Sequence, residues 1–148
     1  MDNQKILPAT IGGSMIFFQW DTYFETGNDT IDSQHKDFFS IIDKLQNAIH
    51  SENTDHINNL SEEFIAHLNG HFTYENDLMK KLNYPGYFSH KAEHDRFFEK
   101  VKRNLKDLDK KPIDEIDSFF EVSYRWFKNH LEINDRKLVK FLKDNNIN

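Results

Sequence analysis

Two pairs of potential metal-binding side chains, each pair spaced four residues apart, lie between residues 71 and 94: His71 with Glu75, and His90 with His94. On an α-helix this spacing places both side chains on one face, about 5–6 Å apart at Cβ. Segment 83–86 (Asn-Tyr-Pro-Gly), between the pairs, favours a chain reversal. Two consecutive helices could therefore bring three imidazoles and a carboxylate to one point, a donor set suited to a transition metal.

Further groups of this kind occur at His35, His130 and Asp135. One inward-facing histidine is usually a hydrogen-bonded core residue, so none of these residues is informative alone. Together, however, five histidines and Glu75 occupy positions on apolar helix faces where Leu or Phe would be expected. Burying such a set is costly unless its members are paired or bind metal. A purely structural hydrogen-bond network is the alternative explanation.

The spacing of His130 and Asp135 indicates an irregular turn. Asp135 follows His130 by five residues, and five steps of about 100° would leave the two side chains about 140° apart on a regular α-helix. A π-type turn, which closes residue i onto i+5, would align them. We therefore predict a widened turn between these two residues.

The remaining three histidines are expected to lie outside the cluster. His50 and His56 flank the connection between the first two predicted helices and are expected to be solvated. His67 lies one helical turn before His71 and is expected either beside the metal-binding residues or partly exposed.

Apolar residues recur at helical spacing in four segments, which predict helices from about residue 32 to 50, from 53 or 54 to 82, from 87–89 to 108 and from 112 to 130. Asp32 is the expected N-cap of the first helix, and a short C-terminal helix is expected near residues 138–142. The short connections predict an all-α, antiparallel up-down-up-down four-helix bundle. Residues 15–31 are expected to form an extended arm packed on it and residues 1–14 a flexible N-terminal extension, so that residues 15–148 form one domain.

Composition narrows the classes of function. The chain of 148 residues has a net charge of −6 and no cysteine. Disulfides, iron–sulfur clusters and thiolate zinc sites are therefore excluded, and neither nucleic acid nor an anionic membrane is an expected partner. No apolar run approaches the roughly 20 residues of a membrane span, so a cytoplasmic location is the default expectation.

Seven donor groups on four helices indicate two metal ions, with Fe, Mn, Zn or Cu all compatible. If Glu75 and Asp135 each bridge both ions, five imidazoles and two carboxylates supply nine metal–ligand bonds. A bridging solvent oxygen adds one bond per ion, whereas two six-coordinate ions need twelve. One position then stays open, on the metal with two histidines, where a small diatomic molecule could bind.

Five stretches and Asp135 carry a resemblance to a known family. They are Phe17-Phe18-Gln19-Trp20-Asp21, Ile31-Asp32-Ser33-Gln34-His35-Lys36, His71-Phe72-Thr73-Tyr74-Glu75, His90-Lys91-Ala92-Glu93-His94-Asp95-Arg96-Phe97 and Trp126-Phe127-Lys128-Asn129-His130. In these residues the chain resembles the hemerythrin family, specifically the single-domain bacteriohemerythrins.

The resemblance implies a four-helix bundle that holds two non-haem iron ions. One iron would be bound by His90, His94 and His130, and the other by His35 and His71. Glu75 and Asp135 would bridge the irons together with an oxo or hydroxo group, and dioxygen would bind at the open position.

Large apolar residues within four positions of the ligands are expected to wall the ligand pocket, although each could simply belong to the core: Phe38, Phe72, Trp126, Phe127 and Leu131. Phe38 and Phe127 are large enough to crowd the ligand. The function expected from the resemblance is reversible dioxygen binding by a carrier or store, not an enzyme. The alternatives are oxygen or redox sensing, scavenging of peroxide or nitric oxide, and iron handling.

Overall fold

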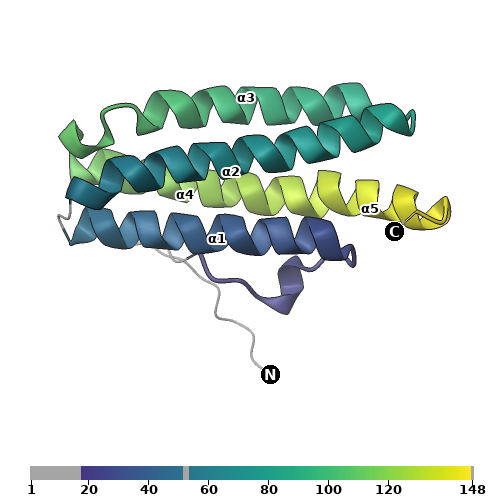
Figure 1. The fold of residues 1–148 in the computed structure, drawn as a ribbon, viewed down its shortest axis with the longest axis horizontal. Helices are drawn as coiled ribbons and strands as arrows, with labels where there is room; N and C mark the ends of the chain where they lie inside the picture. Colours follow the sequence, from purple (N-terminus) through teal and green to yellow (C-terminus); the bar gives the residue numbers. More distant parts are fainter. Residues whose placement is uncertain (1–17, 52–53, 148) are drawn as a thin grey trace.

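The chain folds into a helical bundle (Figure 1). The computed structural model describes residues 18–51 and 54–147, and these contain helices but no strand. The main helices are α1 (Asp29–His50), α2 (Thr54–Lys81), α3 (Tyr87–Leu105), α4 (Ile113–His130) and α5 (Arg136–Asp144), with short helical turns η1 (Thr22–Phe24), η2 (Leu108–Lys110) and η3 (Leu131–Asp135). The all-α prediction is thus confirmed. The expected extension at residues 1–14 and the first apolar residues of the arm, Ile16 and Phe17, lie outside the described residues.

Successive helices run antiparallel, and α4, η3 and α5 form one continuous rod beside α1 (Figure 1). Aromatic side chains fill the space between these rods. Phe38 of α1 stacks on Phe127 of α4 with ring centroids 4.9 Å apart, and Phe97 of α3 stacks on Trp126 of α4 at 3.9 Å. Aromatic contacts of this kind add specific geometry to the burial of a large apolar area. They help to set the spacing between the helices and the rotation of each helix about its own axis, and so which residues face the centre of the bundle.

The N-cap of the first helix lies four residues earlier than expected. Asn28, not Asp32, is its N-cap, and the Asn28 side chain accepts a hydrogen bond from the Ile31 amide at 2.9 Å. Asp32 lies in the first turn and accepts hydrogen bonds from the Thr26 amide and hydroxyl at 2.8 and 2.7 Å. Both residue types favour N-cap positions, so the sequence left two starting points, and the fold of the preceding arm selects the earlier one.

The turn between α2 and α3 reverses the chain as predicted. Asn83 adopts φ 53°, and the Tyr84 amide donates to the Met79 carbonyl at 2.9 Å. This pattern closes a helix with a residue in the left-handed region, which asparagine tolerates better than most residues. At the far end, α3 stops at Leu105, short of the expected residue 108, and Asp107 adopts φ 52°.

The predicted widening after His130 is also confirmed. Residues Leu131–Asp135 form a π-helical segment inside the α4–α5 rod. His130 and Asp135 are both buried, and His130 Nε2 lies 3.2 Å from Asp135 Oδ1. The extra residue per turn therefore brings together two side chains that a regular α-helix would point apart.

The described part of the arm, residues 18–28, packs against α1 and is anchored by the buried rings of Phe18 and Phe24. Trp20 contacts Phe24 and Phe39, with centroids 5.8 and 5.7 Å apart. The arm is not extended throughout, because Asp21 caps the short turn η1. It therefore shields the side of α1 that carries His35, which lies 6.4 Å from Trp20.

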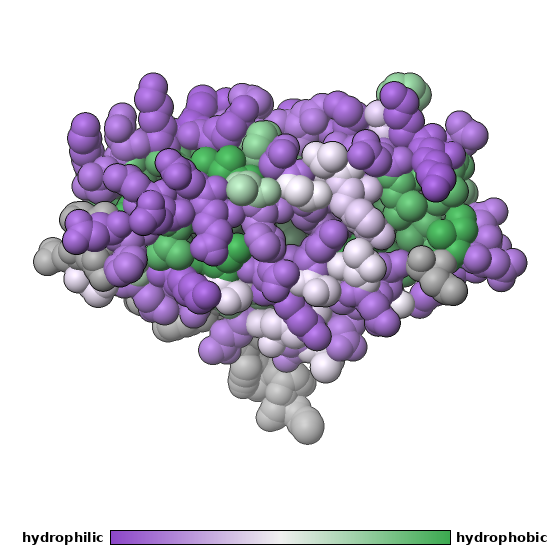
Figure 2. Space-filling model, in the orientation of Figure 1, coloured by the Kyte–Doolittle hydropathy of each residue, from purple (hydrophilic) through white to green (hydrophobic). Residues whose placement is uncertain are grey.

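The surface in Figure 2 is mainly hydrophilic, and one of its apolar areas lies at the end of the bundle that carries α5. Partly buried Leu78, Leu82 and Phe141 pack there around a small second core. Over residues 18–51 and 54–147, no helix has a stretch long and apolar enough to span a membrane.

Candidate metal centre

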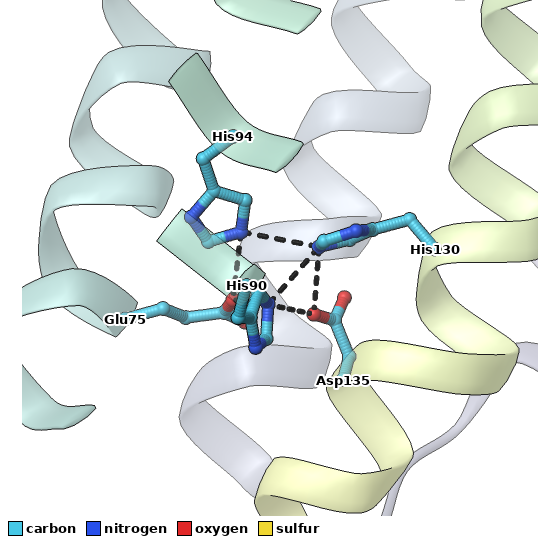
Figure 3. A group of neighbouring side chains, drawn as sticks. All are labelled: Glu75, His90, His94, His130 and Asp135. Carbon is cyan, nitrogen blue, oxygen red and sulfur yellow. Dashed lines mark hydrogen bonds and ion pairs between the residues drawn. The ribbon is translucent and has the colours of Figure 1, made fainter. Parts of the chain in front are cut away.

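Three histidines and both carboxylates form one buried cluster at the centre of the bundle (Figure 3). One donor atom from each of His90, His94, His130, Glu75 and Asp135 lies within 4.8 Å of all the others. His130 Nε2 lies 3.1 Å from both His90 Nε2 and His94 Nε2. These residues come from α2, α3 and the α4–α5 rod. We call this group the three-histidine cluster.

A second group shares both carboxylates with the first. His35 of α1 and His71 of α2 join Glu75 and Asp135 within the same 4.8 Å limit, and their Nε2 atoms are 3.1 Å apart. We call this group the two-histidine cluster. All seven residues expected at the site are therefore buried together, from every long helix of the bundle.

Each carboxylate turns one oxygen toward each cluster. Glu75 Oε1 lies 3.3 Å from both His90 and His94, whereas Oε2 lies 3.3 Å from His71. Asp135 Oδ1 lies 3.1 Å from His90, and Oδ2 lies 3.2 Å from His35. Glu75 and Asp135 are thus oriented as two carboxylates would be if each bridged a pair of cations.

The outer hydrogen bonds of two imidazoles direct their inner nitrogens toward the centre of the cluster. His94 donates its Nδ1 proton to Asn76 Oδ1 at 2.8 Å, and His130 donates its own to Glu93 Oε1 at 3.3 Å. In a neutral imidazole the other nitrogen then carries a lone pair. If both rings are neutral, their Nε2 lone pairs face each other at 3.1 Å. A proton or a metal cation between the nitrogens would relieve this repulsion. In the metal-free protein a proton can do so, because, against the effect of burial, Asp135 raises the pKa of His130.

The donor spacing also matches metal coordination. Metal–nitrogen bonds of about 2.1 Å at right angles would place neighbouring donors about 3.0 Å apart. The donor pairs that are in direct contact within the two clusters lie 3.1 to 3.3 Å apart. Five donors in the three-histidine cluster exceed a tetrahedral set. The residues therefore fit a metal of higher coordination number, for which imidazole and carboxylate suit iron.

Without metal, the cluster must balance its buried carboxylates with protons. Burial lowers the pKa of His90, but hydrogen bonds to Asp135 and Glu75 outweigh it and raise the pKa to about 9. Burial and Asp135 act to raise the pKa of Glu75, yet the surrounding imidazoles hold it at about 2. Burial lowers the pKa of His71 to about 4. Protons and metal ions thus compete for the same donor nitrogens.

Hydrogen bonds to the outer nitrogens of three histidines follow a pattern that the sequence analysis missed. Gln34, next to His35 on α1, accepts from His71 on α2 at 2.6 Å. Asn76 of α2 likewise accepts from His94 of α3, and Glu93 of α3 accepts from His130 of α4. In each case a residue adjacent to a cluster member on one helix orients the histidine of the next helix. The sequence signal that could have indicated these contacts is a polar residue directly adjacent to a candidate ligand.

Four of the five expected pocket residues divide between the two clusters. On the side of the two-histidine cluster, Phe127 meets the edge of His35 at 5.0 Å and stacks on Phe38. On the other side, Phe72 stacks on His94 at 4.0 Å and Trp126 stacks on His130 at 4.5 Å.

Leu131, the fifth expected pocket residue, is fully buried at the start of the π-helical turn. Trp20, which no sequence argument had placed near the site, approaches His35 from the arm.

The other histidines lie outside the clusters. His67 is 37% exposed and pairs with Asp37 at 3.4 Å, which agrees with the expectation of partial exposure. His56 is exposed, as expected. The expectation that His50 is solvated is wrong, because it is partly buried and its Nε2 lies 2.8 Å from Asp117 of α4.

The fold and the site define a class: an all-α bundle with a buried histidine–carboxylate cluster able to bind metal. A family profile described as "Hemerythrin HHE cation binding domain" matches residues 26–142. A bacteriohemerythrin from Clostridium acetobutylicum is 32% identical over 127 residues, covering 82% of this chain and 98% of that protein. The chain therefore belongs to the hemerythrin family.

Two further relatives are similar over nearly the same length. A hemerythrin from Themiste dyscrita is 31% identical, covering 80% of this chain and 88% of its own length. A myohemerythrin from Theromyzon tessulatum is 29% identical, covering 81% and 89%. Family membership and the buried donor set together support iron as the metal.

Proposed function

We propose that the chain binds dioxygen reversibly at two iron ions and acts as a carrier or store. The observation that carries this proposal is the sharing of Glu75 and Asp135 between clusters of unequal size. If both carboxylates bridged two irons, one iron would have five protein donors and the other four. An oxo or hydroxo bridge would then complete six-fold coordination of the first and leave one position open at the second. An iron with one open position can bind a small molecule without losing a protein ligand.

The unequal clusters also suggest where the ligand would bind. His90, His94 and His130 would occupy three positions on one iron, so the open position would belong to the iron held by His35 and His71. Phe127 lies against His35, and Phe38 stacks on Phe127, so the two rings provide an apolar wall on that side. Dioxygen is small and uncharged, so an apolar wall admits it while disfavouring water and anions.

Burial supports binding rather than turnover. His35, Glu75 and Asp135 have no exposed surface. The ordered outer hydrogen bonds of His71, His94 and His130 hold these rings in fixed orientations. The chemistry supplied by the irons is electron donation to bound dioxygen. The role of the chain is to orient the donors and keep water away.

The test is an oxygen titration of the iron-loaded, reduced protein. We expect an absorption band that appears when oxygen is added and disappears when oxygen is removed, over repeated cycles. Asp37→Ala is a matched control, because Asp37 is an exposed carboxylate near the site that contacts His67 and no cluster residue. One-way oxidation in a single cycle would contradict reversible binding. Rapid one-way oxidation with consumption of peroxide or nitric oxide would favour the scavenging enzyme.

A further inference from the structure

We infer that Glu93 is a positioning residue that acts through His130 to favour the higher oxidation state of the iron in the three-histidine cluster. This inference rests on the iron site of the proposed function and adds a residue outside the seven expected ligands. Glu93 is on α3, one position before His94, but its partner is His130 of α4. It therefore links the outer face of the bundle to a buried donor nitrogen.

The contact is directional. His130 Nδ1 donates to Glu93 Oε1 at 3.3 Å, so the Nε2 lone pair of the same ring points into the three-histidine cluster. Trp126 stacks on the ring of His130 at 4.5 Å and limits its rotation. Because this stack restrains the ring, we expect a change of charge at Glu93 to reach the cluster through the imidazole.

Glu93 differs in charge from the other two residues in the same role. Gln34 and Asn76 accept from His71 and His94 through neutral amide oxygens. Among the three outer hydrogen-bond acceptors found in the described residues, the one that contacts His130 is the only carboxylate. The three-histidine cluster thus receives one anionic acceptor that the two-histidine cluster lacks.

A carboxylate acceptor changes the donor strength of the imidazole. It draws the Nδ1 proton toward itself and raises the basicity of the opposite nitrogen, which strengthens the bond to a metal. The stronger donor stabilises ferric iron more than ferrous iron, because the ferric ion carries the larger charge. Glu93 is 35% exposed and Arg96 lies 3.8 Å from its second oxygen, so solvent and this cation weaken the effect without removing it.

The experiment measures the reduction potential of the iron-loaded protein in three variants. Glu93→Gln keeps the acceptor oxygen and removes the charge, and we expect about a tenfold loss in the preference for ferric over ferrous iron, a rise of about 59 mV for one electron. Asn76→Asp adds a charge in the matching contact to His94, and we expect a shift of opposite sign. Asp95→Asn is the control, because Asp95 carries the same charge on the same helix but pairs with Lys91.

The two signs separate an electronic role from a structural one. If Glu93 only held His130 in place, Glu93→Gln and Asn76→Asp would shift the potential in the same direction or not at all, and the inference would be overturned. A shift in Asp95→Asn equal to that in Glu93→Gln would also overturn it, because surface charge alone would then be sufficient.

A second measurement does not depend on redox chemistry. We expect a chelator to extract iron faster from Glu93→Gln than from Asp95→Asn, since a weaker imidazole donor binds metal less tightly. Equal extraction rates would count against the inference. An iron-loaded protein with unshifted potentials would leave the proposed function standing, whereas a wild-type protein that takes up no iron would refute both.

Discussion

Replacing Asp135 with alanine should damage both halves of the site at once. Asp135 Oδ1 lies 3.1 Å from His90 Nε2 and Oδ2 lies 3.2 Å from His35 Nε2, so each cluster loses one donor. His35→Ala, in contrast, removes a donor from the two-histidine cluster alone. We expect the iron content of Asp135→Ala to fall below two ions per chain, with both ions weakened. His35→Ala should lose the second ion and retain the first.

The magnitude can be worked from the binding linkage. An ion held at a free concentration 100 times its Kd stabilises the folded state by about 2.7 kcal/mol, and two ions by about 5 kcal/mol. For a chain of 148 residues, each kcal/mol shifts Tm by about 2–4 °C. Iron should therefore raise the Tm of the wild-type protein by about 10–20 °C. The rise should be roughly halved in His35→Ala and should approach zero in Asp135→Ala.

The assay combines iron content per chain with thermal unfolding of the iron-loaded and metal-free forms. Asp37→Ala should behave as the wild type in both. Asp135→Asn keeps the volume of the side chain and serves if the alanine variant does not fold. Two tightly bound ions per chain in Asp135→Ala, with the wild-type rise in Tm, would refute the bridging role of this residue.

Three further predictions concern the same centre. Iron uptake near pH 7 should release protons, because the pKa of His90 is raised to about 9 in the metal-free protein. For the same reason, the apparent affinity for iron should rise by up to about tenfold per pH unit toward pH 9. Iron uptake without proton release in a weakly buffered titration would be inconsistent with this. Phe127→Ala should lower the free energy of unfolding in urea by about 3–5 kcal/mol. It should also speed azide binding to the oxidised protein, since Phe127 abuts His35. An unchanged rate of azide binding would place Phe127 away from the path by which ligands reach the site. His67→Ala should leave iron content at the wild-type value, because the side chain is paired with Asp37 outside the clusters, and loss of iron would show that His67 supports the site.

Contacts within one helix were accessible from the sequence, because helical periodicity relates spacing to direction. The pairs His71–Glu75 and His90–His94 needed only the four-residue rule. The π-helical turn before Asp135 was predictable for the same reason, since five residues could not align on a regular helix. The seven buried histidine and carboxylate side chains also limit how the helices can be aligned with one another, because these side chains must lie close together to be paired or bound to metal.

Contacts between helices were harder to predict, because they depend on register and on side-chain reach. His50 was expected in solvent, but its partner Asp117 is 67 residues away on α4. The outer partners of the histidines were missed for a similar reason, since Glu93 adjoins His94 in sequence yet contacts His130. The start of α1 depended on the arm, where Thr26 engages Asp32 and leaves Asn28 as the cap.

X-ray absorption at the iron edge tests most directly whether two metals share the centre. If Glu75 and Asp135 bridge the clusters, the iron-loaded protein should show nitrogen and oxygen donors at about 2.1 Å and a second iron at roughly 3.5 Å. A spectrum with light-atom donors and no iron–iron scattering, at full iron loading, would contradict the bridged pair.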